Sequence, residues 1–142
     1  MANNQKEECI FCKIINGEVP CYKIYENKFI LAFLDVNPIS DGHTLVIPKK
    51  HYENVLDCDD KYLEETIKAI KIITNHYKKN LKCTAFNIAN NSGKDAGQVV
   101  NHLHFHIIPR YKNDGLISWP TRNCECEKLS DLCNKLSLVH KK

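Results

Sequence analysis

The hydrophobic and polar positions of this chain follow two different periods. Runs of apolar or β-branched residues are typical of strands, and five such runs predict strands at 22–25, 29–34, 43–47, 84–89 and 99–109. Apolar residues at steps of three and four predict helices at 59–81 and 126–140, and a helical turn at 11–16 ends before Gly17. The order of three strands, a helix, two strands and a helix indicates an α+β fold with a mainly antiparallel sheet.

The composition is that of an ordinary globular domain. Of the 142 residues, 43% are hydrophobic and 26% are charged, and the net charge of +3 is too mild for a dedicated nucleic-acid binder, which usually carries a dense basic patch. The N-terminus lacks the features of a secretory signal, and no apolar run approaches the ~18 residues of a membrane-spanning helix. We therefore expect a cytoplasmic protein that binds neither nucleic acid nor membrane.

Eight cysteines and seven histidines are the unusual feature of the composition. Eight cysteines are about 5.6% of the chain, below the density that marks a small disulfide scaffold. In a reducing compartment, cysteines are more often thiols or metal ligands than disulfides. We expect Cys83 and Cys133 to pack as small apolar residues.

Three histidines stand at alternate positions of the last predicted strand. Residues 102–108 read HLHFHII, and because alternate side chains of a strand share a face, His102, His104 and His106 are expected on one side. Two residues of strand rise would separate neighbouring imidazoles by about 6.5–7 Å. Such a row could be a metal site, a chance surface pattern, or a site for phosphate chemistry. In the last case a neutral imidazole attacks and a protonated neighbour stabilises phosphate charge.

The loop before this strand favours phosphate chemistry. Residues 91–98 read NSGKDAGQ, in which Gly93 and Gly97 allow close backbone approach, while the amides and Gln98 can hydrogen-bond anionic oxygens. Most loops rich in Gly and Asn are simple turns, so the loop matters because it directly precedes the histidines.

These residues resemble the histidine-triad (HIT) family. The segment NNSGKDAGQVVNHLHFHIIPR contains the family's signature of three histidines alternating with hydrophobic residues, and CIFCKIINGEVP and LAFLDVNPISDGHTLVIPKKH match as well. The resemblance extends from Cys9 to Trp119 and is strongest to the Hint-like branch, particularly its zinc-containing prokaryotic-type members. It divides the chain into a flexible start (1–8), a HIT domain (9–120) and a C-terminal helical extension (121–142).

The resemblance implies a fold and a chemistry. The fold would be a five-stranded antiparallel sheet with one long helix, and two subunits would pair into a ten-stranded sheet. The chemistry would be the binding of a purine nucleotide such as AMP or GMP, with hydrolysis or transfer at its α-phosphate. Nucleoside phosphoramidates and related nucleotide conjugates would be the substrates.

The resemblance also implies roles for individual residues. His104 would attack the α-phosphate to form a covalent nucleotidyl-imidazole, which water then releases as the nucleoside monophosphate. His106 would hold phosphate oxygens, His43 would support proton transfer, and Asp35 would accept from the ribose hydroxyls. The other expected nucleotide contacts are Ile10, Phe11, Phe33 and Val36 at the base, and Asn91, Gly97, Gln98 and Val99 at the phosphate or leaving group.

Plainer readings of the same residues stay open. Asp35 could cap the turn before Asn-Pro, Phe11 and Phe33 could be ordinary core, and His43 could be a common strand residue. The chain also departs from the family at Val99, where many Hint-like members have a Ser or Thr hydroxyl that could assist the leaving group.

Cys9 and Cys12 form a C-x₂-C pair, which can bind Zn²⁺ or act in redox chemistry. A thioredoxin-like context needs a βαβ pattern, which does not surround this pair. A closed structural zinc site needs four protein ligands. The resemblance to zinc-containing relatives supplies the other two as His51 and His102, which gives a structural Zn²⁺ site.

Three functions fit this sequence. The first is a nucleotide hydrolase or nucleotidyl transferase that acts through His104. The second is a nucleotide-binding regulatory or scaffold protein with little activity, which would have the same binding residues. The third is a zinc-dependent hydrolase with the histidine row as catalytic ligands, which would need an open metal site.

Overall fold

The structure is a computed structural model that describes residues 8–117 and 119–139. The predicted flexible start at 1–8 therefore lies almost wholly outside the described residues. The described chain contains one five-stranded sheet in which every pairing is antiparallel, with the strand order β1-β2-β3-β5-β4. The strands are β1 (Lys23–Glu26), β2 (Ile30–Leu34), β3 (Thr44–Pro48), β4 (Ala85–Ala89) and β5 (Phe105–Arg110). The predicted α+β class and antiparallel sheet are confirmed.

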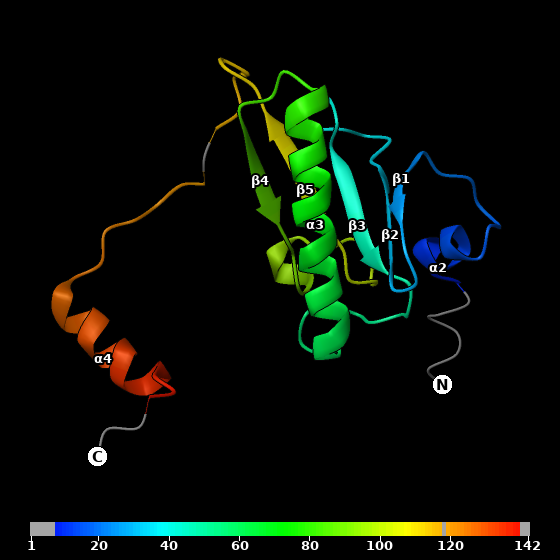
Figure 1. The fold of residues 1–142 in the computed structure, drawn as a ribbon. Coiled ribbons are helices and arrows are strands. Elements are labelled where there is room, and N and C mark those ends of the chain that lie inside the picture. The colour runs from blue at the N-terminus through cyan, green and yellow to red at the C-terminus, as the bar shows by residue number, and fades with distance from the viewer. Residues whose placement is uncertain (1–7, 118, 140–142) are drawn as a thin grey trace.

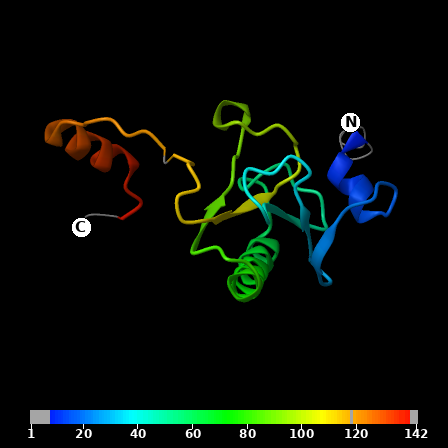
Figure 2. The same cartoon turned by 90° about the horizontal axis from the view of Figure 1, so that it is seen from above.

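Helices cover both faces of this sheet (Figure 1). The long helix α3 (Asp60–Asn80) lies across one face, and the short helix α2 (Ile10–Ile15) lies on the other, as the view from above shows (Figure 2). Alternate residues of β2 explain this arrangement: Ile30 and Ala32 pack with α3, whereas Leu31 and Phe33 pack with α2. The continuous apolar run at 29–34 therefore belongs to a strand that is covered on both faces.

Strand β5 begins later than predicted, at Phe105, so His102 and His104 precede the strand. The ladder with β3 stops at the pair Val46 and Phe105. β3 continues to Pro48, which has no N–H to donate to a neighbouring strand. The carbonyl oxygen of Pro48 lies 2.9 Å from His102 Nε2. The predicted spacing of about 6.5–7 Å between neighbouring imidazoles is wrong for His104 and His106. The rings of His104 and His106 are 5.1 Å apart, centroid to centroid.

The C-terminal helix α4 (Cys126–Leu136) is shorter than the predicted 126–140, whose last residue lies outside the described chain. It stands apart from the sheet and from α3 in both views (Figures 1 and 2). The prediction that Cys133 packs as an apolar residue is wrong, because its side chain is exposed, whereas Cys83 is buried as expected. No helix among the described residues is long and apolar enough to span a bilayer.

Candidate functional site

A cavity of about 890 Å³ opens between α2, β2 and the ends of the loops that precede β5. Its volume suits a nucleotide-sized ligand. Ten of the eleven residues predicted to contact a nucleotide line it: Ile10, Phe11, Phe33, Asp35, Val36, Asn91, Gly97, Val99, His104 and His106. The sequence did not single out three other wall residues: Cys21 and Tyr22, which lie between α2 and β1, and Leu45 of β3.

His104 is a buried histidine whose ring orientation is fixed by the backbone. Its Nδ1 lies 2.7 Å from the carbonyl oxygen of His102, so Nδ1 carries the proton and donates it to that oxygen. The lone pair of the neutral ring is then on Nε2. Burial lowers the pKa of His104, although the hydrogen bond to His102 and the charge of Asp35 oppose this shift. The ring at the cavity wall is therefore a neutral imidazole with an available nucleophilic nitrogen.

His43 and His106 form a second pair with fixed protonation. The amide N–H of Ile39 donates to His43 Nδ1 over 3.0 Å, so in the neutral ring the proton is on Nε2. His43 Nε2 lies 2.9 Å from His106 Nδ1, which must accept that proton. The remaining proton of His106 is consequently on Nε2. Burial lowers the pKa of His106 to about 4, so this N–H donor is held in a neutral ring at pH 7.

Asp35 lies at the edge of this pair. One carboxylate oxygen accepts from the Asn37 amide at 2.8 Å, and the other lies 3.6 Å from His43 Nε2. Burial lowers the pKa of His43, and the charge of Asp35 opposes that shift. The carboxylate therefore faces the cavity beside the histidine pair and can accept hydroxyl hydrogens there.

The loop that ends at Gln98 is built differently from the prediction. The side-chain oxygen of Gln98 accepts from the Gly93 amide at 2.8 Å, and its nitrogen donates to the carbonyls of Glu53 and Val100 at 2.7 and 3.0 Å. Gln98 is buried and does not line the cavity. In this structure the side chain ties the loop to its neighbours, and its contact with a phosphate stays a prediction.

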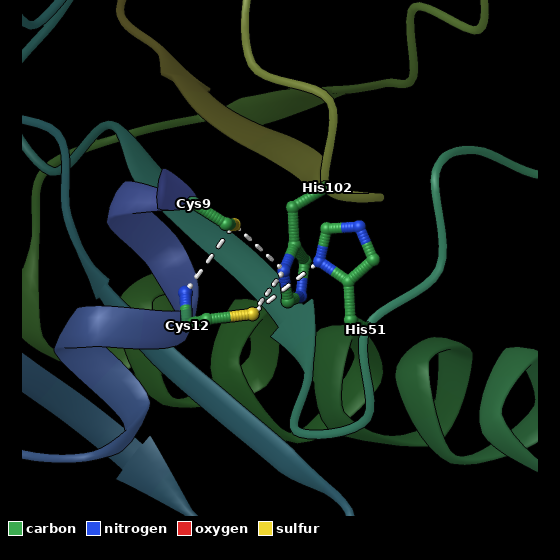
Figure 3. A group of neighbouring side chains, drawn as sticks. All are labelled: Cys9, Cys12, His51 and His102. Carbon is green, nitrogen blue, oxygen red and sulfur yellow. Dashed lines mark hydrogen bonds between the residues drawn. The ribbon is translucent and has the colours of Figure 1, made fainter. Parts of the chain in front are cut away.

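A second cluster gathers Cys9, Cys12, His51 and His102, the four residues predicted to bind zinc (Figure 3). Their ligand atoms all lie within 4.8 Å of one another. Cys9 Sγ and Cys12 Sγ lie 3.3 and 3.6 Å from His102 Nδ1, and Cys12 Sγ lies 3.3 Å from His51 Nδ1. A tetrahedral zinc ion with ordinary bond lengths separates its sulfur and nitrogen ligands by about 3.6 Å.

The surroundings of His102 also fit a metal ligand. Its Nε2 lies 2.9 Å from the Pro48 carbonyl oxygen, so this nitrogen carries the proton and Nδ1 is left with the lone pair that faces the two cysteines. Metal-bound histidines usually hold their second nitrogen in this way. With four protein ligands and no open position, the donor set suits a structural ion rather than a catalytic one.

Among the described residues, a second group could in principle hold a metal ion: Asp35, His43 and His106. In this group, however, a proton occupies one of the nitrogen atoms that would have to bind the ion. Their ligand atoms are also within 4.8 Å of one another. Because the Ile39 amide occupies the lone pair of His43 Nδ1, His43 Nε2 carries a proton and cannot bind a metal. This geometry weighs against the zinc-dependent hydrolase, in which the histidine row would supply catalytic ligands.

Phe11 lies where the two clusters meet. It follows Cys9 by two residues in α2, and its ring packs edge-on against His102, His104 and Phe33 with centroids 5.8, 5.2 and 5.6 Å away. The helix that Cys9 caps and that contains Cys12 therefore also forms part of the cavity wall.

Comparison with known proteins gives concordant matches. Residues 16–113 match the family model described as HIT domain. An uncharacterized HIT-like protein of Borreliella burgdorferi is 48% identical over 92% of this chain and 97% of its own length. An adenosine 5'-monophosphoramidase of Saccharomyces cerevisiae is 41% identical over 90% of this chain and 80% of its own length. The crystal structure of a HIT family member from Bacillus subtilis superposes with a TM-score of 0.84 at 38% identity, covering 95% of this chain and 99% of that one.

Proposed function

This chain belongs to the HIT domain family, and we propose that it hydrolyses purine nucleoside phosphoramidates or related nucleotide conjugates at the α-phosphate. A yeast relative is named as an adenosine 5'-monophosphoramidase, which supports nucleotide hydrolysis as the chemistry of this fold. The observation that carries the proposal is the ring of His104, because a neutral, buried imidazole with its Nδ1 proton bound to a carbonyl presents Nε2 as a nucleophile.

In the first proposed step, the Nε2 lone pair of His104 forms a bond to the α-phosphorus. The bond from phosphorus to the leaving nitrogen breaks, its electron pair goes to that nitrogen, and a proton from water neutralises the departing amine. The Nδ1–H of His104 stays on the His102 carbonyl, which stabilises the positive charge on the ring. The Nε2–H of His106 donates to a phosphate oxygen, held in that orientation by His43.

In the second step, water attacks the phosphorus of the nucleotidyl-imidazole, the bond to His104 Nε2 breaks, and the proton that this water loses goes to the hydroxide left by the first step. The electron pair returns to the ring and the nucleoside monophosphate leaves. Dividing the displacement into two steps lets one site expel an amine and then admit water. Asp35 binds the ribose hydroxyls in both steps, and the base lies against the apolar wall formed by Ile10, Phe11, Phe33 and Val36.

We also propose a structural Zn²⁺ held by Cys9, Cys12, His51 and His102 in a cytoplasmic homodimer. The distances between sulfur and nitrogen atoms and the proton on His102 Nε2 support this ion. When bound, Zn²⁺ would crosslink these four residues and would supply no chemistry at the phosphate. The four residues then fix α2, so that Phe11 holds its position beside His104.

The competing proposal is a nucleotide-binding regulatory or scaffold protein with little activity. The exposed Val99 favours it, because this side chain offers no hydroxyl to assist a leaving group at the cavity rim. The two proposals differ in whether His104 reacts.

An adenosine phosphoramidate with a fluorescent amine separates them. The wild-type protein is expected to release the amine with a burst and to gain the mass of one AMP per chain when it is quenched at neutral pH. His104→Ala is expected to lose ~10⁴-fold or more in kcat, as other enzymes do without their nucleophile. His76→Ala is the matched control, because His76 is an exposed histidine on α3. If wild type and His104→Ala are equally inert while AMP still binds, the regulatory proposal replaces the enzymatic one.

A further inference from the structure

Cys9 and Cys12 are placed to form a disulfide as well as to bind a metal. Cys9 directly precedes α2, and Cys12 is the third residue of that helix. The Cys12 amide N–H donates to Cys9 Sγ over 3.4 Å, so the Cys9 side chain folds back along the first turn (Figure 3). The two sulfur atoms lie within 4.8 Å of each other. Rotation about the side-chain bonds can therefore bring them to the ~2.05 Å of a disulfide.

Cys58 shows what distinguishes this pair from another buried cysteine. The side chains of Cys9, Cys12 and Cys58 are all 8% exposed, so a small oxidant has similar access to each. Burial and three neighbouring aspartates raise the pKa of Cys58 to about 11, so at pH 7 it stays a thiol and reacts slowly. Cys9 Sγ instead lies 3.3 Å from the lone pair on His102 Nδ1, and a second sulfur lies beside it.

A disulfide and a metal ion would use the same sulfur atoms. Cysteine binds a metal as a thiolate, and a disulfide sulfur is not a thiolate. The oxidised pair would therefore leave only His51 and His102, whereas a closed zinc site needs four protein ligands. Because Cys9 and Cys12 belong to one helical turn, their disulfide would not tie α2 to either histidine.

Phe11 connects this pair to the nucleotide cavity. It lies between the two cysteines in α2, and its ring packs edge-on against His104 with the centroids 5.2 Å apart. A metal held by the two cysteines and His102 would attach α2 to the segment that leads to His104. Oxidation would remove that attachment, so that packing alone would hold Phe11 against His104.

We propose that Cys9 and Cys12 are a redox-modification site, which hydrogen peroxide oxidises to a disulfide that weakens nucleotide binding. One thiol sulfur attacks a peroxide oxygen, the O–O bond breaks, and the thiol hydrogen leaves with the other oxygen as water, which gives a sulfenic acid. The second sulfur attacks the sulfenic sulfur, the S–O bond breaks, and the hydroxide leaves with the second thiol hydrogen as water. Each sulfur loses one electron, and the peroxide takes both. The disulfide is independent of the proposed function, whereas its effect on nucleotide binding rests on it.

Peptide mapping of the full chain tests the disulfide. The chain is treated with a small molar excess of hydrogen peroxide, its remaining thiols are alkylated, and it is digested with trypsin. The tryptic peptide 7–13 carries Cys9 and Cys12 and no other cysteine, and the peptide 51–61 carries only Cys58. We expect peptide 7–13 to lose both alkylation sites at least ~10-fold faster than 51–61 loses its one, and a thiol reductant to restore both. Equal rates, or sulfinic acids in place of the disulfide, would overturn the proposal.

A matched pair of variants separates a dithiol from two single thiols. Cys9→Ser leaves the sulfenic acid of Cys12 without a second sulfur, so dimedone should label it, whereas the wild type should form the disulfide and stay unlabelled. Cys58→Ser removes an equally buried cysteine and should form the disulfide as the wild type does. Equal dimedone labelling of Cys12 in the wild type and in Cys9→Ser would overturn the proposal.

Titration calorimetry with AMP measures the effect on the cavity. It uses a Cys21→Ser chain, because Cys21 lines the cavity and its own oxidation could weaken binding. Peroxide should weaken AMP binding by ~10-fold, the scale of one aromatic contact, and reductant with zinc should restore it. An unchanged affinity in a chain that contains the disulfide would overturn the proposal. Zinc analysis before oxidation and AMP binding by the reduced chain test the proposed function separately, and peptide mapping decides the disulfide in either case.

Discussion

Two histidine clusters lie side by side in this protein and differ in which ring nitrogen carries the proton. In the cysteine cluster (Cys9, Cys12, His51 and His102), a carbonyl accepts from His102 Nε2 and leaves the Nδ1 lone pair facing two thiols. In the carboxylate cluster (Asp35, His43 and His106), a backbone N–H occupies the corresponding lone pair of His43, and its Nε2–H points at His106.

The position of the ring proton distinguishes the two clusters, whereas the distances between their ligand atoms do not. Both clusters hold their ligand atoms within 4.8 Å, and burial lowers the pKa of His102 and of His106 to about 4. The backbone partner of each ring decides whether a lone pair or a proton faces the cluster. The cysteine cluster is therefore arranged to receive a cation, and the carboxylate cluster is arranged to donate a hydrogen bond to an anion.

Removing one thiol should give the largest effect. Cys12→Ser leaves three ligands, so we expect zinc to fall from one ion per chain to near zero. The free energy of unfolding should fall by roughly 4 kcal/mol or more, the range typical of a lost structural metal. Metal analysis of the purified protein and denaturant unfolding measure both quantities. Below its unfolding transition, the variant should keep kcat within about tenfold of wild type, because no ligand of this cluster contacts the phosphate in the proposed mechanism.

Cys58→Ser is the control for that change, because Cys58 is also a buried cysteine but lies outside the cluster. It should keep one zinc ion per chain. A full complement of zinc in Cys12→Ser, or none in the wild type from metal-replete expression, would remove the cysteine cluster as a metal site.

Removing His43 should give the opposite pattern. His43→Ala deletes the donor that orients His106, so we expect kcat to fall by about 100-fold while zinc stays at one ion per chain. His43→Gln should recover part of that loss, because its amide can accept from Ile39 and still donate to His106. Steady-state kinetics on the phosphoramidate measure the difference. Equal loss in the Ala and Gln variants would show that the fixed proton of His43 does not matter for the reaction.

The sequence predicted the elements better than the directions of their polar side chains. Alternation and apolar runs placed all five strands, because burial on a sheet imposes those patterns. The cysteine cluster and most of the cavity wall were named through the family resemblance, and the structure brings those residues together.

The sequence could not predict which partner each polar side chain would hydrogen-bond to. The Pro48 carbonyl oxygen accepts a hydrogen bond from the ring of His102, so the β3–β5 ladder starts only at Phe105. The Gln98 amide satisfies three backbone groups rather than facing the cavity. The Ile39 amide fixes His43 from four residues away. Each of these hydrogen bonds depends on where a backbone group lies after folding. Neither the hydrophobic periodicity nor the residue type predicts that position.

The smallest predicted effect tests whether the two clusters are independent. Phe11 touches both, through His102 and His104, and Phe11→Leu keeps an apolar side chain while removing the ring edge from each contact. We expect KM to rise about fivefold, which corresponds to ~1 kcal/mol of lost packing at the cavity wall. Zinc should stay at one ion per chain and kcat should change by less than twofold, because neither the four ligands nor the His43–His106 pair has moved. Loss of zinc in this variant, measured alongside the kinetics, would show that Phe11 holds the cysteine cluster together and that the clusters act as one unit.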